Sequence, residues 1–552
     1  MRALAGMLLW TVLSAHAAER APPWTAVREE AIRAHVDFLA SDLLEGRAAA
    51  SRGYDVAAGY VAAQFRQAGL TPAGTDTTFF QSVPLIEATP VLPGSSADYV
   101  LDGRTRTFEY GTHYLPSADF SAASSTLSAP LVFAGFGIDA PELEHDDFAN
   151  IDVKGRIAII FTGAPASFPN HQRAYYSWMT RKWMTLVDHG AVGAVVVDSP
   201  VDAKRMPWER MVAMSWTPQM RWLDEQGVAR DAFPELKLRF RFNHEAAAQL
   251  FERAPVPFDQ VLARADAGDA QGFELPGMLT LSATTGLRRT ESANVLGVLT
   301  GSDPQLKNEY VVLTAHLDHL GRGSAVNGDS IYNGAHDNAV GVAILLEMAR
   351  ALQASGVKPR RSLLFAAVTA EEKGLLGSDY LVQRAQAAGQ RIVADVNIDK
   401  PLPLAPVQDM VMLGAEHSTL GGIARTAAAA EGYRLSPEPS PEEVGFIRSD
   451  QFSFVRRGIP ALAVASGYRP RDASLDLDAL RTRFRETNYH QPSDDLSLPL
   501  DYPTAADLAR VGLRIALEAA NAPARPRWNA RDFFGEKFGT TTPAVPSVPS
   551  TQ

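Results

Sequence analysis

Polar side chains follow a short apolar run near the middle of the chain. Residues 310–315 read Tyr-Val-Val-Leu-Thr-Ala, a pattern typical of a buried strand, and His316 and Asp318 come directly after them. After a loop rich in Gly and Asn, Asp337 stands just before a helical pattern over 339–354. In open α/β sheets, ligands gather at the carboxyl ends of strands. This stretch therefore predicts half of a metal site.

Later segments supply the remaining polar groups. Two further strand patterns end in acidic residues, the first in Glu371 and Glu372 and the second in Asp399. His490 follows in a loop rich in Pro and Asp. Imidazole and carboxylate ligands suit Zn²⁺ or a similar divalent ion. Because the chain has no cysteine, a zinc ion could be bound here only by His, Asp or Glu.

The adjacent acids Glu371 and Glu372 indicate the chemistry. Buried neighbouring carboxylates repel each other unless a cation lies close by. At a strand-to-helix turn the two side chains point in different directions, so one can bind metal while the other reaches the water to be activated. The expected reaction is hydrolysis assisted by two metal ions, with a general base adding about 10²–10⁴-fold.

Each of these residues, taken alone, also fits an ordinary structural role. Asp337 could cap a helix, and Glu371 and Glu372 could complement a helix dipole. Asp399 could begin a turn, and His490 could be a surface histidine. Their order and their shared position at strand ends favour a functional site.

With these residues in place, the sequence resembles the M28 family of co-catalytic zinc peptidases. The resemblance covers nearly all of the chain after its first residues. A middle region also resembles a protease-associated (PA) domain, through 131–139, 146–163 and 189–198. The peptidase motifs are TAHLDHLG (314–321), GAHDNAVGVAILLEMARAL (334–352), TAEEKGLLGSDYL (369–381), VNIDK (396–400), SDQFSF (449–454) and YHQPSDD (489–495).

The resemblance implies two zinc ions per chain, with Asp337 bridging them. It implies that Glu371 is the general base and that Asp318 orients His316, as metal-bound histidines usually require. It also implies a strained or cis peptide bond after Asp337. The implied metal ligands are His316, Asp337, Glu372, Asp399 and His490.

Some positions depart from the family pattern or stay open. Gln451 stands where many relatives have His, which we interpret as substrate tuning, and Lys400 stands where an apolar residue is more usual. His319 and His336 flank implied ligands and are expected to support them or to be plain loop positions. Asp450 could hold substrate or cap a helix.

Alternating strand and helix patterns predict an α/β fold with a mainly parallel twisted sheet and helices on both faces. The resemblance further implies the zinc-exopeptidase phosphorylase/hydrolase-like fold, with an inserted β-rich α/β PA domain. We expect the Pro-, Thr- and Ser-rich stretch beyond Ala522 to be loosely held. The expected divisions are a signal peptide at 1–17, the first part of the peptidase domain at 25–115, the PA-like domain at 116–275, the catalytic domain at 276–522 and a C-terminal tail at 523–552.

The first residues have the pattern of a secretory signal peptide. Arg2 precedes an apolar run over 4–13, and residues 15–17 read Ala-His-Ala, a cleavage motif. We expect export, to the periplasm or the medium. The run is too short to span a bilayer, and no later segment approaches a membrane-length apolar run. The net charge of −11 argues against nucleic acid or an anionic membrane as partner.

Together with the N-terminal segment, the resemblance implies an exported di-zinc exopeptidase that acts on peptides, most simply an aminopeptidase. The alternatives are a carboxypeptidase or dipeptidase on the same scaffold, for which Arg448, Arg469 or Lys400 would bind the substrate carboxylate. A non-catalytic binding protein with this fold would typically lack some of the ligands, and all are present here. The sequence does not predict the oligomeric state.

Overall fold

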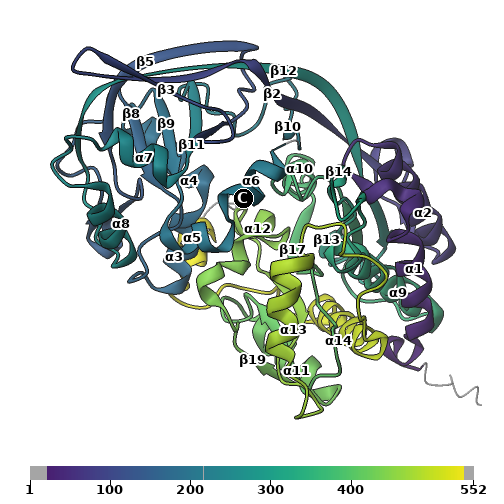
Figure 1. Ribbon diagram of the computed structural model, residues 1–552. Helices are drawn as coiled ribbons and strands as arrows, with labels where there is room; N and C mark the ends of the chain where they lie inside the picture. Colours follow the sequence, from purple (N-terminus) through teal and green to yellow (C-terminus); the bar gives the residue numbers. More distant parts are fainter. Residues whose placement is uncertain (1–20, 216, 540–552) are drawn as a thin grey trace, which may run out of the picture.

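The computed structural model describes residues 21–215 and 217–539 as two lobes that share one sheet (Figure 1). The expected signal peptide at 1–17 lies outside the described residues. Among the described residues the sheet has 16 strands, and its main path runs β19-β18-β20-β17-β13-β16-β12-β5-β8-β9-β11-β4. Off this path are β1 (Thr71–Pro72), β2 and β3 (Arg104–Phe108), and β10 (Gln219–Trp222).

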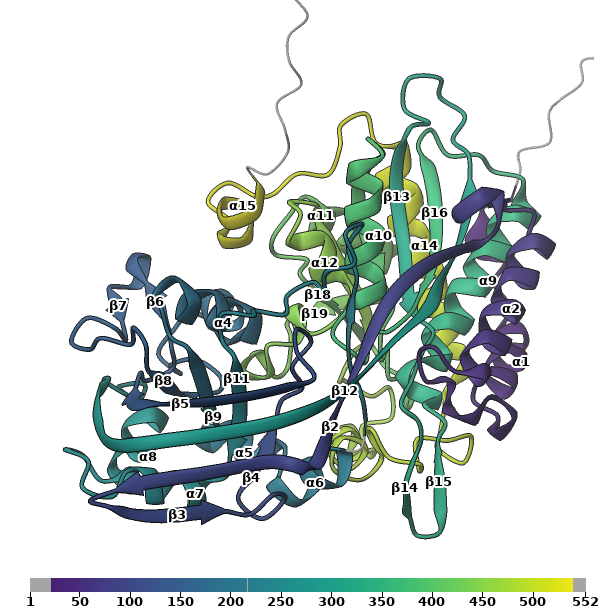
Figure 2. The same ribbon diagram turned by 90° about the horizontal axis from the view of Figure 1, so that it is seen from above.

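Two long antiparallel strands connect the lobes (Figure 2). They are β2 (Phe80–Leu101) and β12 (Phe273–Leu299), which pair from the smaller lobe into the larger one. The two lobes therefore share one continuous strand pair. Residues 286–291 of β12, between the lobes, are mostly exposed, and they stay extended because they pair with β2.

The larger lobe has the expected mainly parallel sheet. Strands β16, β13, β17 and β20 are parallel neighbours, while β12 and β18 flank them in antiparallel orientation. The carboxyl ends of β13, β16 and β17, which are parallel neighbours, lie at the same edge of the sheet. The bounds are β13 (Glu309–His316), β16 (Ser362–Val368), β17 (Arg391–Asn397), β18 (Asp409–Leu413), β19 (Arg434–Ser436) and β20 (Ala461–Ser466).

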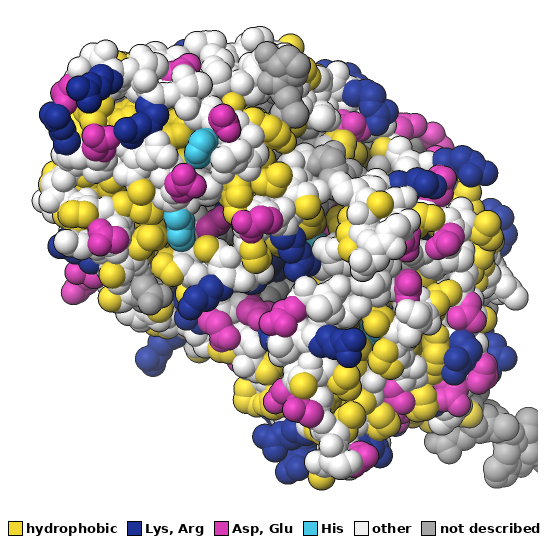
Figure 3. All heavy atoms as spheres, in the orientation of Figure 1, with side chains coloured by type: hydrophobic (Ala, Val, Ile, Leu, Met, Phe, Trp, Pro, Cys, Tyr) yellow, Lys and Arg dark blue, Asp and Glu magenta, His cyan; other side chains and the backbone are white. Residues whose placement is uncertain are grey.

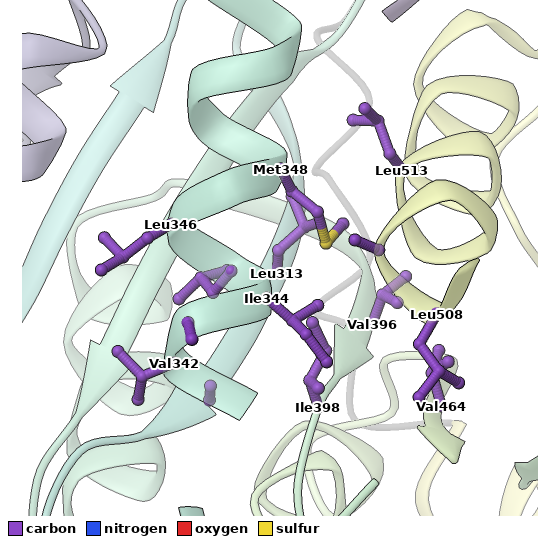
Figure 4. Packing of buried hydrophobic residues seen from close by; sticks show 14 of the residues in the cluster. Leu313, Val342, Ile344, Leu346, Met348, Val396, Ile398, Val464, Leu508 and Leu513 are labelled. Atoms are coloured by element: carbon purple, nitrogen blue, oxygen red, sulfur yellow. The ribbon is translucent and has the colours of Figure 1, made fainter. Parts of the chain in front are cut away.

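Side chains of β13 alternate between two hydrophobic cores. Val311 and Leu313 face the core that includes α9 and α14, whereas Val312 faces the core of α10 and α12. Figure 4 shows the side chain of Met348 of α9 pointing toward α14. Helices thus cover both faces, as predicted. The helices are α1 (Glu29–Leu39), α2 (Arg52–Gln67), α9 (Val340–Ser355), α10 (Leu376–Ala387), α11 (Leu420–Ala430), α12 (Gln451–Val455), α13 (Leu477–Arg483) and α14 (Tyr502–Asn521).

The smaller lobe is an α/β layer with its own core. The expected division at 116 and 275 stays a prediction. The core of the lobe extends past both positions, to Ala97 and to Ala283. The strands are β4 (Tyr114–Pro116), β5 (Ser124–Phe133), β8 (Ile157–Phe161), β9 (Gly193–Val197) and β11 (Leu238–Phe242). The helices are α3 (Asn170–Ser177), α4 (Met179–Asp188), α5 (Pro200–Arg205), α6 (Trp208–Met214), α7 (His244–Leu250) and α8 (Phe258–Asp266).

The expectation of a loosely held segment after Ala522 is wrong for the part of it that the structure describes. Its described part, 523–539, packs against the larger lobe and contains helix α15 (Phe533–Phe538). Phe534 is fully buried, and the indole N–H of Trp528 donates to the Gly458 carbonyl at 2.9 Å. These aromatic side chains outweigh the Pro- and Ser-rich composition around them.

Two short hairpins lie outside the large sheet. The hairpins are β6 (Asp139–Ala140) with β7 (His145–Asp146), and β14 (Gly321–Val326) with β15 (Asp329–Tyr332). On the face shown in Figure 3, basic and acidic side chains are mixed rather than segregated. Within 21–215 and 217–539, no helix has the length and apolarity needed to cross a membrane.

Candidate metal centre

The predicted site residues meet at one edge of the larger lobe's sheet. His316 is the last residue of β13, Glu371 and Glu372 follow β16, and Asp399 follows β17. Because these parallel strands are neighbours, their carboxyl ends bring the side chains together. Asp337 comes from the turn before α9, where its peptide bond to Asn338 is cis.

One half of the centre is formed by His316, Asp337 and Asp399. The Nε2 atom of His316 lies 3.1 Å from Asp337 Oδ1 and 3.0 Å from Asp399 Oδ1. Ligand atoms about 2.0–2.1 Å from a tetrahedral zinc ion lie roughly 3.3 Å apart. The three atoms therefore have the spacing of ligands around one ion.

The other half is formed by Asp337, Glu372 and His490. The Nε2 atom of His490 lies 3.2 Å from Asp337 Oδ2 and 3.2 Å from Glu372 Oε2. Asp337 thus turns one carboxylate oxygen toward each half. This is the arrangement expected of a carboxylate that bridges two ions.

Several atoms at the centre are buried without a hydrogen-bond partner. They are both carboxylate oxygens of Asp337 and the Nε2 atom of His490. Leaving such groups unpaired is costly, and a bound cation removes that cost. The orphaned atoms and the imidazole–carboxylate donor set fit zinc.

Neighbouring charges shift the pKa values at the centre. Burial alone would lower the pKa of His316, but the carboxylates of Glu371 and Asp399 raise it well above its usual range. Burial would raise the pKa of Asp337, yet Lys400 and His316 hold it far below its ordinary value. Asp337 is therefore ionised, as a metal ligand must be.

Glu371 occupies a different environment from its neighbour. Burial raises the pKa of Glu371 well above its usual range, although the charges of His316 and Lys400 act against this. The Glu371 carboxylate is 7% exposed and lies in one group with the side chains of His316 and Glu372. A proton-accepting carboxylate beside the ligands suits a general base.

Asp318 supports the centre in two ways. Its backbone carbonyl lies 3.1 Å from His316 Nδ1, so the main chain orients this histidine. Its carboxylate instead accepts hydrogen bonds from the backbone N–H groups of Glu371 and Glu372. The orienting role that the resemblance implies for Asp318 stays a prediction, since the observed contact with His316 is made by the backbone carbonyl. The contact of the carboxylate with the two acids was not predicted.

A buried arginine and a buried aspartate hold the surrounding loops. The guanidinium of Arg47 is fully buried and donates to backbone carbonyls of Leu317, Asn333 and Gly334, among others. The carboxylate of Asp494 accepts from the N–H groups of His336 and Asp337. These contacts fix the loops on both sides of the site.

One histidine and one lysine lie directly beside the proposed ligands. His319 is fully buried, with Nδ1 2.7 Å from Glu372 Oε1, and its Nε2 atom has no partner. Lys400 Nζ lies 2.9 Å from Asp399 Oδ2. The position of His319 three residues after His316 was the available signal, but the direction of a loop side chain was not predictable.

The side chains of Asp450 and Gln451 are both buried. Asp450 makes no side-chain cap to α12, so the capping alternative is wrong; both its carboxylate oxygens are buried and unpartnered. Burial raises the pKa of Asp450 to about 6. Gln451 is buried, accepts a hydrogen bond from Asn397 and donates one to the Phe446 carbonyl, and its expected role in substrate tuning stays a prediction.

Part of the chain matches a known peptidase family. Residues 294–516 match peptidase family M28, a stretch that contains all of the predicted site residues. The matched stretch is less than half of the chain.

Individual relatives match over shorter stretches. A probable zinc metalloprotease from Pyrenophora teres f. teres (strain 0-1) is 36% identical over 107 residues, or 19% of this chain and 21% of that protein. Leupeptin-inactivating enzyme 1 from Streptomyces exfoliatus is 30% identical over 204 residues, or 36% of this chain and 40% of that enzyme. The chain thus spans less than half the length of these curated relatives.

A solved structure has the same fold over nearly the whole chain. The aminopeptidase from Aneurinibacillus sp. strain AM-1 superposes with a TM-score of 0.52 and 18% identity, covering 91% of this chain and 96% of that one. At this identity the likeness shows the fold alone.

Proposed function

We propose that the protein is a di-zinc exopeptidase that removes residues from the free N-terminus of peptides. The observation that carries this proposal is the bridging position of Asp337, whose two oxygens belong to different three-residue ligand groups. Together with Asp337, His316 and Asp399 would bind one zinc ion, and Glu372 and His490 would bind the other. When bound, the two ions would supply Lewis-acid activation of water and of the peptide carbonyl.

The residues of the chain then move the proton. Glu371 takes a proton from the attacking water and passes it to the leaving amine. The carboxylate of Asp318 holds the backbone of Glu371, so that the base keeps its place beside the ligands. Burial of the site excludes bulk water and strengthens these electrostatic contacts.

The charges around the centre favour an amine over a carboxylate as the substrate's recognised end. Of the candidate cations, Lys400 is engaged by Asp399, and Arg469 lies 3.9 Å from Asp409. Asp450, in contrast, offers buried carboxylate oxygens without a partner, which suit a substrate ammonium group.

A carboxypeptidase remains the second candidate, because two further arginines, Arg205 and Arg448, interact with each other. Burial, followed by the charge of Arg448, lowers the pKa of Arg205, which also interacts electrostatically with Tyr489 beside His490. Because Arg205 already pairs with Asp202 at 2.8 Å, Arg448 is the member of this pair that could bind a C-terminal carboxylate.

The test is a release assay on three matched peptides: one with both ends free, one with a blocked N-terminus and one with a blocked C-terminus. We expect cleavage of the first and third only, and loss of activity with a chelator. Cleavage of the N-blocked but not the C-blocked peptide would establish the carboxypeptidase instead. Metal-independent activity would contradict both.

The base is tested separately with Glu371→Ala, against Glu29→Ala on the exposed start of α1. We expect the first variant to lose activity by at least 10²-fold and the second to keep it, since only Glu371 lies at the ligands. Full activity of Glu371→Ala would refute the proposed mechanism.

We further propose export through the segment 1–17 and a PA-like role for the smaller lobe in restricting access to the site. The contact of α6 with the site loop supports the second point, since the guanidinium of Arg210 donates to the Tyr489 carbonyl. Sequencing the N-terminus of the mature protein tests the first.

A further inference from the structure

A second group of potential metal ligands lies where three parts of the chain meet, and it shares no residue with the centre described above. His171 is in the first turn of α3 in the smaller lobe, whereas Glu416 and His417 lie in the loop after β18. Their ligand atoms all lie within 4.8 Å of one another.

The spacing of these atoms fits one ion. Glu416 Oε1 lies 3.4 Å from His171 Nε2 and 3.7 Å from His417 Nε2. Ligands of a tetrahedral zinc ion lie roughly 3.3 Å apart, so small side-chain adjustments would bring all three into coordination.

The surroundings of His417 suit a metal ligand. Its side chain is 1% exposed, and its Nε2 atom has no hydrogen-bond partner. Its Nδ1 atom lies 2.7 Å from Asp532 Oδ2. A carboxylate that accepts the Nδ1 proton leaves a lone pair on Nε2, directed at Glu416 and His171, which is the arrangement seen around metal-bound histidines.

The ring of His417 is also held in place. It stacks on Phe446 with ring centroids 4.7 Å apart and meets the edge of Phe534 at 4.9 Å. Asn529 of the C-terminal segment bonds to the backbone carbonyls of both Glu416 and His417. The ligand loop is therefore rigid before any ion binds.

The other two ligands are open to solvent. The side chains of His171 and Glu416 are 40% and 56% exposed, so an ion can enter and a water molecule can take the fourth position. Two imidazoles and one carboxylate suit zinc better than calcium or magnesium, which prefer oxygen ligands.

We propose that His171, Glu416 and His417 bind one zinc ion that fixes α3 of the smaller lobe to the larger lobe. The C-terminal segment is part of the same junction, because α15 packs against α3 and Asp532 orients His417. The proposal does not depend on the peptidase activity. Its consequence is that zinc sets how firmly the smaller lobe is held.

Zinc content measured by elemental analysis tests the binding. Wild-type protein, His171→Asn and Glu416→Gln are stripped with chelator, reloaded with ZnCl₂ and gel-filtered, with His189→Asn on the same lobe as matched control. We expect each variant to carry about one zinc ion per chain fewer than wild type and control. Equal zinc content in all four proteins would overturn the proposal.

Hydrogen exchange of α3 tests the clamp without reference to activity. Added ZnCl₂ should slow exchange over 170–177 at least severalfold in wild type and in His189→Asn, but not in His171→Asn or Glu416→Gln. Both substituted side chains are partly exposed, so folding should be preserved, and the melting temperature of the zinc-free proteins checks this. Zinc-induced protection that survives in both variants would show that the ion binds elsewhere.

Discussion

The carboxylate of Asp318 lies 3.1 Å from the backbone nitrogen of Glu371, and its other oxygen lies 3.3 Å from that of Glu372. One buried side chain therefore positions both the proposed base and a proposed ligand. Burial, the largest cause, raises the pKa of Asp318 to about 7. The turn between β16 and α10 depends on this acceptor pair.

Asp318→Asn should lower kcat/KM by about 10–100-fold, the usual effect of losing a group that supports metal ligands. In this variant the side-chain NH₂ group would face one of the two backbone N–H groups. That N–H group would then have no acceptor. Steady-state kinetics on a free peptide measures the loss, with Asp55→Asn on the exposed face of α2 as control. If both variants keep wild-type kinetics, the turn does not need this carboxylate.

Asp337→Asn should remove zinc from the catalytic centre, since the bridging carboxylate is shared by both ligand groups and its charge is lost. Elemental analysis of the gel-filtered protein gives the zinc content, and Asp329→Asn in the exposed hairpin serves as the matched change. We expect loss from the first variant alone. An unchanged zinc content would show that Asp337 is not a shared ligand.

His35 should make the fold sensitive to acid. Its pKa is lowered from 6.5 to about 4, chiefly because burial disfavours the charged ring, whose Nδ1 lies 2.8 Å from the Tyr60 hydroxyl. The unfolded chain then binds more protons between these values, so stability is present above pH 6.5 and falls as the pH drops to 4. The loss from this residue is at most about 3 kcal/mol.

Denaturant unfolding of wild type and His35→Gln at pH 7 and at pH 4.5 checks this expectation. The free energy of unfolding should fall less between the two pH values in the variant, because glutamine does not titrate. Identical pH dependence of the two proteins would contradict it.

Phe534→Ala should destabilise the protein by about 3–5 kcal/mol, the usual range for removing a buried phenylalanine. Phe533→Ala, at the neighbouring and only partly buried position, should cost less. Thermal unfolding compares the two variants. Equal and small effects would mean that α15 is not firmly packed.

The parts of the fold that were predictable from the sequence have strong local patterns. The strand before His316 is an unbroken apolar run, and the helix after Asp337 is rich in Ala, Leu and Val; both lie within a residue of where the patterns place them. Because parallel strands end at one edge, the residues after them could be assigned to one site.

Contacts that depend on side-chain direction were not predictable in this way. His319 turns toward Glu372, and the carboxylate of Asp318 accepts a hydrogen bond from the backbone of another loop. Neither contact produces a periodic pattern in the sequence. The packing of the C-terminal segment depends on Phe534 and Trp528 meeting a distant surface. Composition alone therefore gave the wrong result there.

The continuity of β12 restricts how the chain can change in length. Between the two lobes of the protein, β12 pairs with β2 as an exposed ribbon. Beyond this ribbon, Val295 of β12 lies in the core beside β16. Successive side chains alternate between faces, so inserting one residue in the ribbon would turn Val295 away from the core. Length differences among relatives at this position should therefore come in even numbers and be matched on both strands.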